Sequence, residues 1–95
     1  MSPVAATLSR HAQERVQQRA IPLMVVDLLQ RFGSSMRCGG AERLFFDKSA
    51  TRRLKQHLGN NSLKSLERWL RVYVVAGDDG LVVTVAHQSR RFRRP

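Results

Sequence analysis

Cysteine is nearly absent from this sequence, which contains only Cys38. One cysteine cannot form a disulfide within the chain, and it offers no thiolate cluster for zinc or iron–sulfur chemistry. No apolar stretch approaches the roughly 20 residues that a membrane-spanning helix needs. The first residues also lack the basic and apolar segments of a secretion signal. We therefore expect a cytoplasmic protein that has no membrane partner and that folds through apolar packing alone.

Acidic residues are also few, because 7 Asp+Glu stand against 17 Lys+Arg, for a formal net charge of +10 over 95 residues. This length fits one domain, since a second core would be too small to be stable. We expect a single domain over 1–95, with a loose leader at 1–7, a core at 8–88 and a basic tail at 89–95. Of the 17 cations, 14 are arginine, whose planar guanidinium matches phosphate oxygens and stacks on bases. The composition predicts a polyanionic partner, with nucleic acid favoured over an acidic protein.

Apolar spacing predicts a helix near the start of the chain. Leu8, Ala12 and Val16 recur every four residues, which marks the buried side of a helix over about 9–19. Ser9 precedes the helix and is a typical N-cap residue, because its hydroxyl can accept a hydrogen bond from the first turn.

A second helix is predicted directly after the first. Pro22 fits its first position, where a proline loses no useful hydrogen-bond donor, and Gly33 after Phe32 fits its C-terminal cap. The segment between is apolar on most of its circumference, which predicts a helix buried against a sheet. The two helices would form a hairpin.

Two β-hairpins are predicted in the remainder of the chain. From residue 34 the apolar period changes to two, and Gly39-Gly40 between the alternating runs indicates a hairpin over 34–46. The valine-rich runs 69–76 and 81–86, with turn residues between them, make the second hairpin. Helices followed by antiparallel hairpins are typical of an α+β fold.

One further helix is expected between the hairpins. Asp47 and Ser49 are both N-cap candidates for a helix that ends at Leu58. Weaker leucine spacing predicts only a short helical turn over 63–68. The expected order is ααββαββ, in which an N-terminal helical hairpin packs on one face of a four-stranded antiparallel sheet.

Three cationic or titratable side chains share one face of the first helix. His11, Arg15 and Arg19 are spaced by four residues, so they form a ridge beside the buried side. Like charges at this spacing repel one another, so the ridge is mildly destabilising unless an anion or an acidic neighbour meets it. Either the ridge binds phosphate, or Glu14 and Asp47 neutralise it and His11 is an ordinary surface side chain.

A second cluster of cations ends the chain. Residues 49–95 hold ten cations and three acids, and the tail has one aromatic residue that could stack on a base. His87 precedes the tail at the end of the last predicted strand, where alternation places it on the face of Leu81, Val83 and Val85. A histidine can give or take a proton near neutral pH. The alternative interpretation is a solvated end that only keeps the protein soluble. The arginines of the tail are Arg90, Arg91, Arg93 and Arg94.

The chemistry that these residues favour is RNA cleavage without a metal. No metal-ligand spacing, phosphate-binding glycine loop or serine-nucleophile motif occurs in the sequence, and we expect no cofactor. Attack of a ribose 2′-hydroxyl on phosphorus needs a base, an acid for the departing oxygen, and cations for the phosphoryl oxygens. His11 and His87 are the candidate acid/base pair. The candidate nucleic-acid-binding residues are Arg15, Arg19, Arg43, Arg90, Arg91, Arg93 and Arg94.

Two segments carry a resemblance to a known family. The segment from Leu8 to Ile21 resembles the "His-Ala-x-x-Arg-x-x-x-Arg-x-Ile" start of a family of small bacterial proteins, a domain of unknown function that is itself similar to the RelE/ParE toxin superfamily. His11, Arg15 and Arg19 occupy the motif positions. The segment 80–85 is similar to the "Gly-x-Ile-Val-Thr-Val" closing strand of that family.

The resemblance implies a helical hairpin on a small antiparallel sheet, as in RelE-like and barnase-like ribonucleases. RelE-type members act on mRNA at the ribosome, whereas ParE-type members share the fold and poison DNA gyrase. The resemblance leads us to expect a RelE-like, metal-independent endoribonuclease that belongs to a toxin module. Its target would be RNA or the ribosome, and its partner would be an acidic antitoxin. The alternative is a non-catalytic protein that binds nucleic acid or inhibits a nucleic-acid-associated enzyme. The segment 49–68 is an insertion relative to the RelE pattern.

Overall fold

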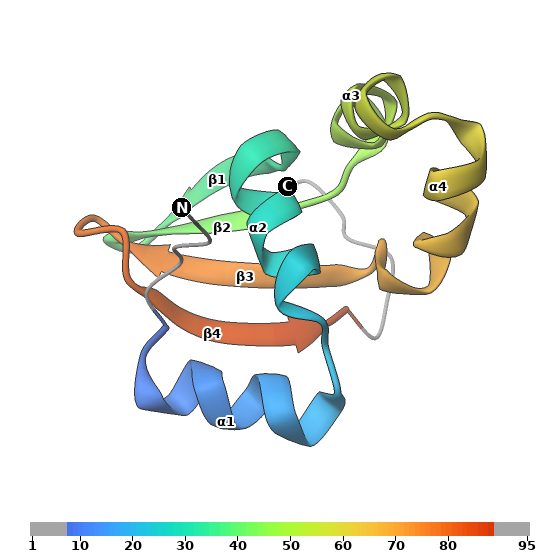
Figure 1. The fold of residues 1–95 in the computed structure, drawn as a ribbon. Coiled ribbons are helices and arrows are strands. Elements are labelled where there is room, and N and C mark those ends of the chain that lie inside the picture. Colours follow the sequence, from blue (N-terminus) through green and yellow to red (C-terminus); the bar gives the residue numbers. More distant parts are fainter. Residues whose placement is uncertain (1–7, 89–95) are drawn as a thin grey trace.

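The computed structural model describes residues 8–88. The elements in this part of the chain are α1 (Arg10–Arg19), α2 (Leu23–Phe32), β1 (Ser34–Cys38), β2 (Ala41–Phe45), α3 (Lys48–Leu58), α4 (Asn60–Ser65), the 3₁₀ turn η1 (Glu67–Trp69), β3 (Val72–Gly77) and β4 (Val82–His87). The strands form one antiparallel sheet in the order β1-β2-β3-β4, so the predicted α+β class is confirmed (Figure 1). None of the helices between residues 8 and 88 has the length and apolar character required to cross a bilayer.

Helices α1 and α3 begin where a side chain can cap them. Ser9 caps α1 as predicted. Of the two candidates for α3, Asp47 is the N-cap, accepting a hydrogen bond from the Ala50 N–H at 2.8 Å, while Ser49 lies inside the helix. Asp47 also accepts a hydrogen bond from the Ser34 hydroxyl at 2.7 Å. The cap therefore ties the start of α3 to the start of β1.

The two ends of α2 differ in detail from the prediction. Pro22 is the N-cap in an extended conformation, with φ −63° and ψ 137°, and is not the first helical residue. Gly33 does end the helix, yet its φ of −67° is one that any residue adopts. A Cβ at Gly33 would instead lie 2.5 Å from the carbonyl oxygen of Leu29. The close approach of the chain to α2 therefore explains this glycine.

The segment between the hairpins is more helical than predicted. In place of a short turn over 63–68, the chain forms α4 and then η1. Residues 69–71 were predicted to lie in a strand, but β3 begins only at Val72. The physical reason is packing, because Leu66 is buried and Leu70 half-buried against the cluster that includes Leu54 of α3. A helical turn places these side chains on one side, whereas an extended chain would not.

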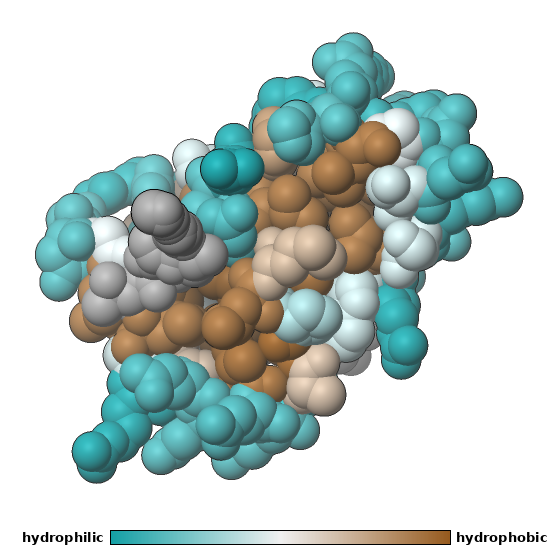
Figure 2. Space-filling model, in the orientation of Figure 1, coloured by the Kyte–Doolittle hydropathy of each residue, from teal (hydrophilic) through white to brown (hydrophobic). Residues whose placement is uncertain are grey.

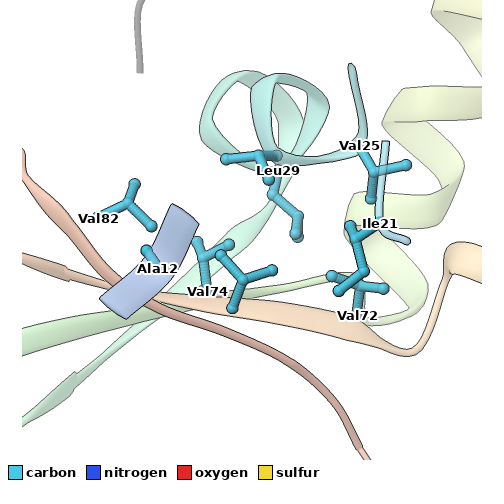
Figure 3. Packing of buried hydrophobic residues seen from close by; sticks show 9 residues of the cluster. Ala12, Ile21, Val25, Leu29, Val72, Val74 and Val82 are labelled. Atoms are coloured by element: carbon cyan, nitrogen blue, oxygen red, sulfur yellow. The ribbon is translucent and has the colours of Figure 1, made fainter. Parts of the chain in front are cut away.

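The core consists of two apolar clusters that meet at Phe46 and Trp69. α1 and α2 cover the same face of the sheet (Figure 1). The first cluster lies between these helices and β3–β4, and its buried members are Ala12, Ile21, Val25, Val26, Leu29, Val72, Val74, Val82 and Val85 (Figure 3). The second cluster joins α2, α3 and the end of α4 through Leu28, Leu54 and Leu66. Both Phe46 and Trp69 pack against each cluster.

Helix α2 packs against the sheet as predicted, but only one side of it is buried, and its other side, which includes Gln30 and Arg31, is exposed. Val25, Val26 and Leu29 are at most 1% exposed. At the N-terminal end of the helix, however, Leu23 and Met24 are 50% and 53% exposed. Figure 2 shows apolar surface over the middle of this side of the molecule, where α2 lies, and hydrophilic surface over α1.

An irregularity in β4 changes which of its residues share a face. The pairing with β3 shifts by one residue in the middle of the strands, so Val83 is an extra residue that forms a β-bulge. As a result Val82 and Val85 are both fully buried, at 0% exposure. The predicted alternation from Leu81 through Val83 to Val85 is therefore wrong. Beyond the bulge the alternation holds, and His87 lies on the face of Val85.

Candidate nucleic-acid interface

Helix α1 carries the first predicted site on its solvent side. Ala12 is fully buried and Val16 packs against the core. His11 and Arg19 are exposed and Arg15 is half-buried. The Nε of Arg15 donates to Nε2 of His11 at 3.5 Å, which is at the long limit for a hydrogen bond. We call His11, Arg15 and Arg19 the α1 ridge.

The ridge has no carboxylate partner among the described residues. The side-chain ion pairs that join residues within 8–88 lie on other elements, and they are Arg31–Asp27 at 3.6 Å and Arg37–Asp78 at 2.9 Å. Glu14 lies on α1 but takes part in neither pair. Asp47, the other predicted neutralising group, lies at the N-terminus of α3 and caps it. The positive charge of the α1 ridge is therefore open to an external anion.

His87 lies beside a second group of aromatic and cationic side chains. It pairs with Val72 at the start of β3. Its ring centroid lies 5.9 Å from that of Trp69, with the two planes at 34°. The guanidinium carbon of Arg68 lies 5.1 Å from the centre of the Trp69 ring. One indole ring therefore contacts both a guanidinium and an imidazole at this end of the sheet.

The cations of the predicted tail lie outside the described residues, and they are Arg90, Arg91, Arg93 and Arg94. The last described residue is Gln88, whose N–H donates to the carbonyl oxygen of Arg71 at 2.8 Å. Arg71 is exposed. The described chain thus ends next to Arg71 and His87, at the end of the sheet that holds Trp69.

The two candidate acid/base histidines lie toward opposite ends of the α1–β4 pair. The Ser9 N–H donates to the carbonyl oxygen of Val82 at 2.8 Å, so α1 begins where β4 begins. His87 is five residues beyond Val82, which is about 16 Å in an extended strand. His11 lies only about 3 Å beyond Ser9 along the helix axis. Roughly 13 Å therefore separate the two backbone positions along the strand direction.

Other contacts agree with this separation. In Figure 3, Ala12 and Val82 lie toward one end of the core cluster, and Ile21 and Val72 lie toward the other. The ring of His87 packs against Trp69, which precedes β3 and lies beyond the end of the sheet. To serve one phosphate as base and acid, the two imidazoles would need to lie within roughly 10 Å of each other. The structure does not bring His11 and His87 together, and Arg19 is the ridge residue at the end of α1 toward His87.

Arg43 lies on the face of the sheet opposite to α1 and α2. It pairs with Val75, whose neighbour Val74 faces the core. The guanidinium carbon of Arg43 lies 4.9 Å from the centre of the half-buried Tyr73 ring on the same face. The sheet therefore separates Arg43 from the α1 ridge. The sequence analysis had placed Arg43 in the same set of RNA-binding residues only because of its charge.

Sequence reasoning missed Arg68, Trp69 and Arg71 as site residues, because it divided them between a short turn over 63–68 and a valine-rich strand over 69–76. A signal was present in the sequence. Leucines continue at helical spacing to Leu70, so the helical segment extends past the predicted turn at 63–68. This signal places Trp69 at a helix end, where one side of a ring can pack and the other can meet solvent.

Comparisons with family models, curated proteins and solved structures give no match to this chain. The fold and the site are therefore the basis for any functional proposal. Between residues 8 and 88 no three His, Cys, Asp or Glu side chains lie close enough together to hold a metal ion. Arginine, histidine and tryptophan side chains are what this surface offers to a ligand.

Proposed function

We propose that this protein binds RNA through the α1 ridge. The observation that carries the proposal is that His11, Arg15 and Arg19 lie along one helix face without a carboxylate partner among the described residues. Arg15 and Arg19 are like charges at four-residue spacing, an arrangement that is mildly destabilising and that a bound anion would relieve. Phosphate oxygens match the donor geometry of arginine, and such charge-assisted hydrogen bonds are the strong ones.

The shape of the surface supports binding along a nucleic-acid backbone. α1 packs along β4, from the bond between Ser9 and Val82 to the contact of Ile21 with the core near Val72. A helix of 10 residues presents a track about 15 Å long. Because α1 is held flat on the sheet, its ridge suits contact with successive phosphates of a strand. RNA also agrees with the family resemblance of the α1 segment.

The test is the salt dependence of binding to a labelled single-stranded RNA, measured by fluorescence anisotropy. Each phosphate contact contributes about 0.7 to the slope of log K against log salt for a single strand. The double variant Arg15→Gln/Arg19→Gln should therefore lower the slope by about 1.4. Arg31→Gln is the matched control, because Arg31 is an exposed helical arginine that pairs with Asp27. An equal loss of slope in the control, or no wild-type binding at low salt, would refute the proposal.

A second candidate function is the metal-independent endoribonuclease of RelE type. The observation that favours it is the position of His87, whose half-buried ring lies at the sheet end beside Trp69 and next to the backbone of Arg71. In this candidate, His87 acts without His11 as the proton donor or acceptor. Free and ribosome-bound RNA incubated with EDTA should then give fragments with 2′,3′-cyclic phosphate ends. Intact RNA in both reactions would leave binding as the function.

A further inference from the structure

We infer that Trp69, with Arg68 and His87, forms a stacking site for a base of single-stranded RNA. This inference rests on the proposed function and specifies that the RNA bound is single-stranded. Bases of a single strand are free to stack on protein rings, whereas those of a duplex stack on one another. We call these three residues the stacking site.

Trp69 has the two properties that a stacking ring needs. It packs against both apolar clusters, so contacts with the core fix the position of the Trp69 side chain. It is also only half-buried, so part of the residue reaches the surface. A ring that is fixed in advance loses little side-chain entropy when a base binds.

The guanidinium of Arg68 lies over the indole ring of Trp69, which shows that a flat, polarisable group fits there. Its carbon is 5.1 Å from the ring centre, and Arg68 is exposed and makes no hydrogen bond or ion pair with another described residue. Stacking of a base on an aromatic ring is stronger than an exposed cation–π contact. A base can therefore replace Arg68 over the indole, and the released guanidinium can bind a neighbouring phosphate.

Charges around the stacking site suit the backbone on either side of that base. Arg71 is exposed, and its backbone is bonded to Gln88 beside His87. Arg19 ends α1 at the same end of the sheet. A strand whose phosphates follow the α1 ridge toward Arg19 would therefore bring its next bases to Trp69.

Intrinsic fluorescence tests the inference without any substitution, because Trp69 is the only tryptophan of the chain. We expect single-stranded oligoadenylate and oligouridylate to quench its emission in step with binding measured by anisotropy. Inorganic polyphosphate supplies phosphates without bases, so it should bind and leave the emission unchanged. Duplex RNA should likewise bind through its phosphates with little quenching.

The possible failures are distinguishable. Binding of the oligonucleotides with unchanged tryptophan emission would overturn the stacking site and leave the proposed function in place. Absence of binding would overturn the proposed function itself. Quenching by polyphosphate equal to that by oligoadenylate would also overturn the inference, since the emission would then report on charge.

Two variants extend the test. Trp69→Leu should lower the affinity for oligoadenylate about tenfold while leaving the affinity for polyphosphate unchanged, with circular dichroism as the check on folding. Arg68→Gln removes an exposed side chain and should not disturb the core. It should retain the quenching by oligoadenylate and lower the salt slope by about 0.7. Loss of quenching in Arg68→Gln would show that the guanidinium, and not the indole, meets the base.

Discussion

The backbone N–H of Ser9 donates to the carbonyl oxygen of Val82 across 2.8 Å, which sets the position of α1 along β4. Because of this bond, the helix and the strand start together. The ridge residue His11 consequently lies toward the start of β4, and Arg19 lies toward its end. The basic surface is therefore a track along the sheet edge and not a single point.

Substitution of the two histidines should have unequal effects on RNA cleavage, if the protein cleaves RNA. The backbone positions of His11 and His87 lie roughly 13 Å apart along the strand direction, and the ring of His87 packs against Trp69, so we expect only one of the two histidines to act in cleavage. We expect His87→Ala to abolish cleavage and His11→Ala to retain the cleavage rate while weakening RNA binding. Single-turnover cleavage at saturating protein separates the two effects. Equal loss of the cleavage rate in both variants would show that the histidines do converge.

Removal of the Asp47 cap should destabilise the fold. Asp47 accepts hydrogen bonds from the Ala50 N–H and from the Ser34 hydroxyl, and loss of an N-cap costs about 1 kcal/mol. We expect Asp47→Ala to lower the free energy of unfolding in urea by about 1–2 kcal/mol. Ser49→Ala is the matched control, since Ser49 is exposed in the first turn of the same helix. A larger effect of the control would reassign the cap to Ser49.

A methyl group at Gly33 should also destabilise the protein. The added Cβ would lie 2.5 Å from the carbonyl oxygen of Leu29, which is backbone of α2 and cannot rotate away. Overpacking of this kind costs about 1–3 kcal/mol. Urea unfolding of Gly33→Ala measures the loss, with Ser35→Ala at an exposed position of β1 as the reference. An unchanged midpoint for Gly33→Ala would mean that the end of α2 relaxes without cost.

Local signals in the sequence predicted much of the fold. The N-cap Ser9 could be predicted because an N-cap depends only on a few adjacent residues. The end of α2 at Gly33 could be predicted for the same reason. The core position Ala12 followed from helical spacing, whereas the apolar composition of 23–32 did not separate the buried Val25 from the exposed Leu23 and Met24. These features need no knowledge of which elements meet in space.

Features that depend on tertiary contacts could not be predicted in this way. The bulge at Val83 comes from the pairing of β4 with β3, which a single strand pattern does not contain. The separation of His11 from His87 depends on the direction of α1 along β4, and the placement of Arg43 behind the sheet depends on strand register. The contact of Arg68 with Trp69 depends on where η1 ends. The strand propensity of 69–76 predicted a strand across this boundary.

The measurement that tests the central claim most directly is the mapping of backbone amide chemical shifts during titration with a single-stranded RNA. If RNA binds along the α1 ridge, the largest changes will fall on residues 10–19, with further changes at 67–71 and His87. Changes centred on α3 and α4, or on the edge strand β1, with the α1 amides unmoved would contradict it.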